Sequence, residues 1–184
     1  MTEADRADGY VMTLNGRKVL RFVRYLDRPV EKVWAALVVP ERVADWLGRL
    51  EIEPRVGGRY NLVFGDDGSR ATGIIQDFDP PRRLAYTWGD NTPDPEHPGV
   101  VFEVAPDGTG SRLTLTTQFP KDHPGDPAEA VATWHEFLRA IPLAVDGQRM
   151  PWDAARRMRW TSLFEPYRTI LASAGLVSAV TRSD

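Results

Sequence analysis

The 184-residue chain contains no cysteine, and this absence excludes several kinds of chemistry at once. Disulfide bonds, a catalytic thiolate and cysteine-ligated zinc or iron–sulfur centres all require that residue. The three histidines, His97, His123 and His135, include no pair at the i, i+4 spacing of a helical metal site. The sequence also lacks a P-loop, a dinucleotide-binding glycine motif and a nucleophile elbow. We therefore expect neither a metal nor another cofactor.

Two further absences concern charge and long apolar runs. Lysine and arginine number 23 against 26 acidic residues, so the net charge of −3 leaves no surplus to neutralise the phosphates of a nucleic acid. No segment approaches the roughly 18 continuous apolar residues of a membrane-spanning helix. Residues 1–9 are acidic and polar, without the apolar core of a signal peptide. These features predict a cytoplasmic protein that binds neither nucleic acid nor membrane.

Two tryptophans twelve residues apart, Trp34 and Trp46, are the most informative feature that is present. A β-rich segment, residues 19–26, precedes them. Pro29 is then suited to the first turn of a short helix that carries Trp34, and Pro40 to the start of a second that ends near Trp46. Both tryptophans are expected to pack these helices under a sheet, and Trp46 could also border a ligand cavity.

The hydrophobic period changes to two after residue 50, which is typical of strands. Alternating segments are separated by short Gly, Pro and Asp turns, so the expected sheet is an antiparallel meander of six to seven strands. The segments are 19–26, 50–54, 60–64, 71–78, 84–88, 100–104 and 113–117.

A long amphipathic helix is predicted from about residue 128 to 146, with Pro142 interrupting it and Gly147 as its C-cap. We divide the chain into a flexible lead-in (1–12), one α+β domain (13–150) and a helical extension (151–184), with a break near Glu165 before Pro166. The Arg156–Arg159 run is expected to be a solvated helix face, or else, beside Trp152, Trp160 and Phe164, to border an interface. The apolar face of the extension either folds back on the domain or forms a homodimer through this C-terminal helix.

The order of elements and several short strings resemble the helix-grip fold of the START-like (SRPBCC) superfamily. The bacterial branch similar to the C-terminal domain of the activator of heat-shock-protein ATPase is the nearest match. The strings are Pro29-Val-Glu-Lys-Val-Trp34, Pro40-Glu41 with Trp46, Pro54-Arg-Val-Gly-Gly-Arg-Tyr60, Asp79-Pro-Pro-Arg-Arg-Leu84 with Trp88, and Gly110-Ser-Arg-Leu-Thr-Leu115. The resemblance covers roughly residues 17–147. It implies a curved sheet that wraps the long helix and leaves an internal cavity.

We therefore expect a binding module that holds a small apolar or amphipathic molecule between the sheet and the long helix, without catalysis. Aromatic side chains on the inward phase of the strands supply apolar area, and a few polar tips orient the ligand. The candidate ligand-binding residues are Trp46, Tyr60, Phe64, Tyr86, Trp88, Phe102, Trp134, His135 and Leu138.

Two other functions stay open. A cyclase- or dehydratase-like enzyme on the same scaffold would need ionisable groups that converge on the pocket, and Tyr60, Tyr86, Arg112 and His135 are the candidates. A chaperone-associated protein-interaction module would use an exposed face instead. His135 is expected either to pair with a carboxylate or carbonyl at the sheet edge, or to transfer a proton at the cavity rim.

Overall fold

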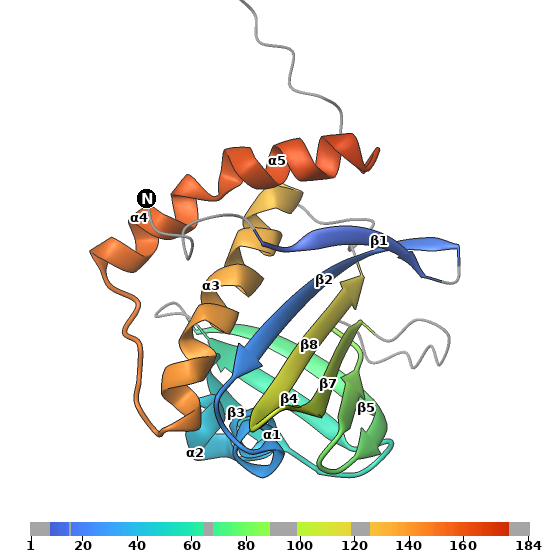
Figure 1. The fold of residues 1–184 in the computed structure, drawn as a ribbon, viewed down its shortest axis with the longest axis vertical. Helices are drawn as coiled ribbons and strands as arrows, with labels where there is room; N and C mark the ends of the chain where they lie inside the picture. The colour runs from blue at the N-terminus through green and yellow to red at the C-terminus, as the bar shows by residue number, and fades with distance from the viewer. Residues whose placement is uncertain (1–7, 15, 65–67, 89–98, 119–125, 177–184) are drawn as a thin grey trace, which may run out of the picture.

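Eight antiparallel strands form one sheet in the order β1-β2-β8-β7-β6-β5-β4-β3, and five helices pack with it (Figure 1). This computed structural model describes residues 8–14, 16–64, 68–88, 99–118 and 126–176, and the side chains of these residues except 17, 18 and 64. The strands are β1 Tyr10–Leu14, β2 Arg17–Leu26, β3 Arg49–Ile52, β4 Arg59–Phe64, β5 Ser69–Asp79, β6 Arg83–Tyr86, β7 Val100–Asp107 and β8 Gly110–Gln118.

The sheet has one strand more than the sequence analysis predicted, because β1 lies in residues assigned mostly to a flexible lead-in. Tyr10 pairs with Arg21 and Leu14 with Arg17, so β1 forms an edge hairpin with β2. Gly16 has a φ of 76°, which glycine adopts without strain. The Asn15-Gly16 dipeptide is a hairpin signal, and it could have identified the strand before it.

The two short helices lie where they were predicted. Helix α1 spans Val30–Val38 and α2 spans Pro40–Val43. Pro40 is the first residue of α2, where its missing N–H would have no partner in the helix. Trp34 and Trp46 are both buried. Helix α2 packs against β3, and α1 packs against β7, β8 and α3.

Helix α3, Pro127–Val145, runs along the inner face of the sheet (Figure 1). The Asp126 side chain accepts a hydrogen bond from the Ala128 N–H and so caps its start. Pro142 does not end the helix, which continues to Val145. Gly147, with a φ of 73°, ends it as predicted, and its N–H donates to the Ala144 carbonyl at 3.0 Å.

The extension consists of helix α4, Ala154–Ser162, and helix α5, Phe164–Ser173, and it packs back on α3. The break between them falls at Leu163, two residues before the predicted one. Pro166 is accommodated in the first turn of α5. Leu163, Tyr167 and Leu171 are buried, which removes the apolar face of the extension from solvent. Figure 1 shows α5 crossing the N-terminal end of α3.

Strand register divides the sheet into an inner face toward α3 and an outer face toward solvent. Phe102 pairs with Leu84 on one side and with Leu115 on the other, and Leu115 pairs with Phe22. All four side chains are buried and belong to the inner face. Their even alternation with outer-face residues such as Arg21 and Glu103 explains why strand periodicity predicted most of the core.

Candidate functional site

A continuous cluster of six aromatic rings lies between the inner face of the sheet and α3, and we call it the inner aromatic cluster. Tyr86 contacts Tyr60, Trp88 and Phe102, and Trp134 of α3 contacts Trp88 and Phe102 with ring centroids 5.2 and 6.2 Å apart. The members are Trp46, Tyr60, Tyr86, Trp88, Phe102 and Trp134. The structure therefore brings six of the nine predicted ligand-binding residues together.

The tyrosine pair at one end of this cluster depends on a glycine between them. Tyr60 on β4 is paired with Gly73 on β5, and Ile75, two residues on, is paired with Tyr86 on β6. Because Gly73 has no side chain, the two rings stack across β5 with centroids 4.0 Å apart and planes 16° apart. A Cβ at position 73 would lie 2.1 Å from the Thr87 carbonyl oxygen.

The hydroxyl groups of this pair are buried, and their one polar neighbour among the described residues is each other, without a hydrogen bond of good geometry. Tyr60 and Tyr86 are each 1% exposed. Burial raises the pKa of both phenols well above the usual value, so both stay protonated at neutral pH. A buried hydroxyl that lacks a partner costs about 1–3 kcal/mol. The pair can therefore gain from a ligand that supplies a hydrogen-bond acceptor or donor.

Trp46 and Leu138 are both packed in the core. The Trp46 indole N–H donates to the Ala36 carbonyl at 2.7 Å, and its ring meets Phe102 edge to face. Leu138 is fully buried on α3. Trp88 is only partly buried, so it is the member of the inner aromatic cluster nearest to solvent.

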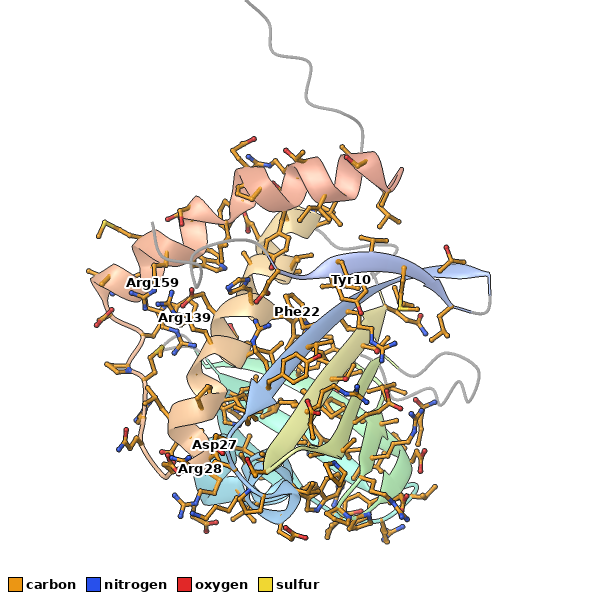
Figure 2. The ribbon with its side chains drawn as sticks, in the orientation of Figure 1. Tyr10, Phe22, Asp27, Arg28, Arg139 and Arg159 are labelled. Carbon is orange, nitrogen blue, oxygen red and sulfur yellow. The ribbon has the colours of Figure 1, made fainter. Side chains whose placement is uncertain are left out.

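His135 lies apart from the inner aromatic cluster, at the contact between α3 and α5. Its Nδ1 is 2.7 Å from the Tyr167 hydroxyl and 3.3 Å from the Asp8 carboxylate. Its ring packs edge to face against Phe22, which Figure 2 labels beside α3. This position matches the packing interpretation of His135, in which a carboxylate lies beside the ring. The ligand-binding and proton-transfer interpretations would both need His135 at the ligand site, and they stay predictions.

Phe64 is the last of the nine predicted ligand-binding residues, and the remaining histidines and Arg112 complete the comparison. Phe64 is the last residue of β4, but its side chain lies outside what the structure describes. His97 and His123 are also outside the described residues. Within the described ranges, no three His, Asp or Glu side chains gather in a way that could hold a metal ion. Arg112, a candidate for the enzymatic alternative, is exposed on the outer face.

A buried charged cluster between α3 and α4 was not predicted, and we call it the Glu136 cluster. Glu136 is fully buried, and its carboxylate lies 3.5 Å from Arg156, 3.8 Å from Arg159 and 3.9 Å from Arg139. Figure 2 shows Arg139 and Arg159 between the two helices. Burial raises the pKa of Glu136, against the opposing effect of the three guanidinium groups.

Arg156 corrects the expectation of a solvated face for residues 156–159. It is 3% exposed and donates to the Met150 and Glu136 carbonyls at 2.9 and 2.8 Å. Its guanidinium also stacks 4.4 Å from the Trp152 ring centre. Burial lowers its pKa. Helical periodicity alone could not locate this residue, because its partners come from α3 and from the segment before α4.

An antiparallel sheet that grips a long helix, with two short helices after an early strand, defines the START-like (SRPBCC) class. The profile of one family in that class, described as "Activator of Hsp90 ATPase homolog 1-like protein", matches residues 27–145. The chain therefore belongs to this family. No curated protein matches the chain significantly.

Several solved structures share the fold. CalU16 from Micromonospora echinospora is 20% identical, with a TM-score of 0.63 over 89% of this chain and 95% of that one. The conserved protein EF2215 from Enterococcus faecalis is 16% identical, with a TM-score of 0.71 over 95% of this chain and 97% of that one. The Aha1 dimer from Colwellia psychrerythraea is 16% identical, with a TM-score of 0.56 over 69% of this chain and 95% of that one. The first two likenesses extend well beyond residues 27–145.

In the part of the chain that the structure describes, none of the helices has the length and apolar character needed to cross a membrane.

Proposed function

We propose that this protein binds a small apolar or amphipathic molecule between the inner face of the sheet and α3. The inner aromatic cluster provides the apolar contacts, with burial contributing about 25 cal/mol per Å² of apolar surface. Tyr60 and Tyr86 orient a polar group of the ligand. The observation that carries the proposal is the pair of buried tyrosine hydroxyls that face each other without a hydrogen bond of good geometry and without another partner among the described residues.

The same geometry gives less support to the enzymatic alternative. Of its four candidate residues, only Tyr60 and Tyr86 lie together, while His135 and Arg112 lie at the α5 contact and on the outer face. Both phenols have raised pKa values because they are buried, so neither is suited to act as a base near neutral pH. Cyclase or dehydratase chemistry would need an ionisable partner beyond these residues.

The interaction alternative depends on an exposed apolar face. In the described part of the extension, Met158 is the large hydrophobic residue that is exposed, at 69%, and the apolar face of α5 is covered by α3. A homodimer through this helix is therefore an alternative with little apolar area to support it. The relative from Colwellia is a dimer, and the same experiment tests both possibilities here.

Native mass spectrometry of freshly purified protein, compared with its denatured mass, tests the proposal. We expect a monomer that carries an additional mass of small-molecule size. The Tyr60→Phe, Tyr86→Phe double variant removes both hydroxyls and keeps both rings, so it should retain the fold and lose most of the bound mass. Thr72→Ala, at an exposed position on β5 next to Gly73, is the matched control and should retain it.

A bare chain mass for the wild type, in a sample handled without organic solvent, would contradict the proposal. A clean dimer without bound mass would favour the interaction module. Equal occupancy in the wild type and the double variant would show that the tyrosine hydroxyls do not orient the ligand.

A further inference from the structure

A polar groove of about 370 Å³ lies on the outer face of the sheet, on the side opposite to the inner aromatic cluster. Its floor is made of small side chains on β7 and β8, including Ala105 and Thr114. Four arginines and two acidic residues surround the floor, which gives a formal charge of +2. The lining residues are Arg21, Asp79, Arg82, Arg83, Glu103, Val104, Ala105, Arg112 and Thr114.

Two of the four arginines are fully engaged by the acidic residues around the groove. Arg82 donates to Asp79 at 3.0 Å. Arg83 donates to Glu103 at 2.9 Å and to Asp77, which is not a lining residue, at 2.7 Å. These three carboxylates are thereby paired, so their charges are largely neutralised at the rim.

The other two arginines, Arg21 and Arg112, have no carboxylate partner among the described residues. Arg21 makes one weak contact, from Nη1 to the Met12 sulfur at 3.7 Å, and its Nε–H is buried without any partner in the described part of the chain. Arg112 is exposed and makes no hydrogen bond or ion pair with the described residues. A buried donor without a protein partner gains free energy from an acceptor that a bound ion or water supplies.

Strand register places these two arginines at opposite ends of one row. Arg21 on β2 is paired with Thr116 on β8, and Thr114 and Arg112 follow on the same outer face of β8. Thr114 therefore lies between the two arginines along this row, and it lines the groove. Guanidinium groups bind phosphate and carboxylate through paired N–H donors, and a hydroxyl can add a further hydrogen bond.

We propose that this groove binds a small organic anion, whose phosphate or carboxylate groups contact Arg21 and Arg112. The volume is in the range of small-molecule sites rather than of macromolecular interfaces. The site is separate from the inner aromatic cluster, because the sheet lies between them. The net charge of −3 for the whole chain makes this local excess of positive charge a feature of the groove, not of the surface in general.

Titration of the full-length protein with inorganic phosphate, and separately with succinate, tests the proposal. Each titration is followed by amide and arginine Nε–Hε NMR signals, with sodium chloride at equal ionic strength as the reference. We expect the Arg21 Nε–Hε signal and the amides of Thr114 and Ala105 to shift with one or both anions and not with chloride. The anion that shifts them at lower concentration identifies the headgroup, phosphate or carboxylate.

Substitutions add a second readout. Arg112→Gln is at an exposed position and should fold normally, yet weaken anion binding by about tenfold or more, because a hydrogen bond to a charged group is lost. Arg21→Gln should do the same. Arg157→Gln, an exposed arginine on α4 outside the groove, is the matched control and should bind as the wild type does.

Binding should also weaken as sodium chloride is raised, since Arg112 is exposed and chloride screens its charge. Shifts that are equal for chloride and the two anions, or equal binding by Arg112→Gln and Arg157→Gln, would overturn the proposal. In that case the Arg21 Nε–H is satisfied by water alone.

Discussion

The Nδ1 of His135 and the hydroxyl of Tyr167 lie 2.7 Å apart, and both side chains are buried. This contact joins α3 to α5. The Gly9 N–H donates to the same hydroxyl at 3.2 Å, and the Asp8 carboxylate lies 3.3 Å from the same ring nitrogen. Three segments far apart in the sequence therefore meet at one buried polar contact, which holds the extension and the start of the chain against the domain.

Tyr167→Phe should lower the free energy of unfolding by about 1–3 kcal/mol. The ring and its contacts with Phe22 remain, but the Gly9 N–H and the His135 nitrogen each lose a partner in a buried place. Urea unfolding followed by circular dichroism measures the loss. Tyr25→Phe, at a tyrosine that is 70% exposed, is the control and should change stability by less than about 0.5 kcal/mol. Equal stability of the two variants would contradict the role given to this contact.

The pH dependence of stability should contain a contribution from Glu136. Burial raises its pKa above the ordinary value of 4.5, so the folded protein binds the proton more tightly than the unfolded chain does. Stability should therefore fall as the pH rises from about 4.5 through the raised pKa, and then level off. Unfolding free energies measured in urea at several pH values between 4 and 8 should show this fall, on the order of 1 kcal/mol per pKa unit.

Glu136→Gln keeps the shape of the side chain and removes the titrating group, so this part of the pH profile should disappear. Glu51→Gln, at an exposed carboxyl on β3, should leave the wild-type profile in place. If the Glu136→Gln profile follows that of the wild type, the carboxyl does not titrate in this range and the Glu136 cluster stays charged throughout.

Local sequence patterns were sufficient to predict most of the fold and the composition of the inner aromatic cluster. Period-two alternation placed Tyr86 and Phe102 on one face of their strands, and helical spacing placed Trp134 on the facing side of α3. These predictions depend only on residues close together in the chain. The missing strand, β1, was also within reach, because the Asn15-Gly16 turn signal was present.

The contacts that sequence patterns could not supply are those between distant segments. In the sequence, Arg156 cannot be distinguished from several exposed arginines. Its contact with Glu136 exists only because α4 packs against α3. The importance of Gly73 likewise appears only once β4, β5 and β6 are in register and the two tyrosine rings are found to stack over it. Sequence periodicity indicates neither relationship. Glu136 and Arg156 are 20 residues apart, Gly73 is 13 residues from each tyrosine, and these spacings depend on the loops between the elements.

Gly73→Ala should therefore be more harmful than an ordinary glycine-to-alanine change in a strand. The new Cβ would lie 2.1 Å from the Thr87 carbonyl oxygen and 3.4 Å from the Tyr86 ring, so the backbone of β5 and β6 must separate. We expect a loss of about 3 kcal/mol, at the upper end for overpacking, together with loss of bound ligand. Thr72→Ala on the same strand is the control. A free energy of unfolding within 1 kcal/mol of the wild type would show that β5 and β6 can separate with little loss of stability.

Replacement of Trp88 or Phe102 by alanine separates the packing role of the inner aromatic cluster from its proposed binding role. Phe102 is fully buried, so Phe102→Ala should cost about 3–5 kcal/mol of stability, whereas partly buried Trp88 should cost less. Both variants should lose ligand, because both rings contact Tyr86 and Trp134. The fraction of ligand-bound chain in native mass spectra and the urea midpoint measure the two effects on the same samples.

The control for this last comparison is Tyr167→Phe, which weakens the protein at the α5 contact without touching the inner aromatic cluster. If ligand loss followed stability alone, the bound fraction in all three variants would fall in step with their urea midpoints. We expect Tyr167→Phe to keep more ligand than its urea midpoint would indicate and Trp88→Ala to keep less, because Trp88 contacts the cluster directly and Tyr167 does not. Normal occupancy in Trp88→Ala and Phe102→Ala, in spite of lowered urea midpoints, would place the ligand elsewhere.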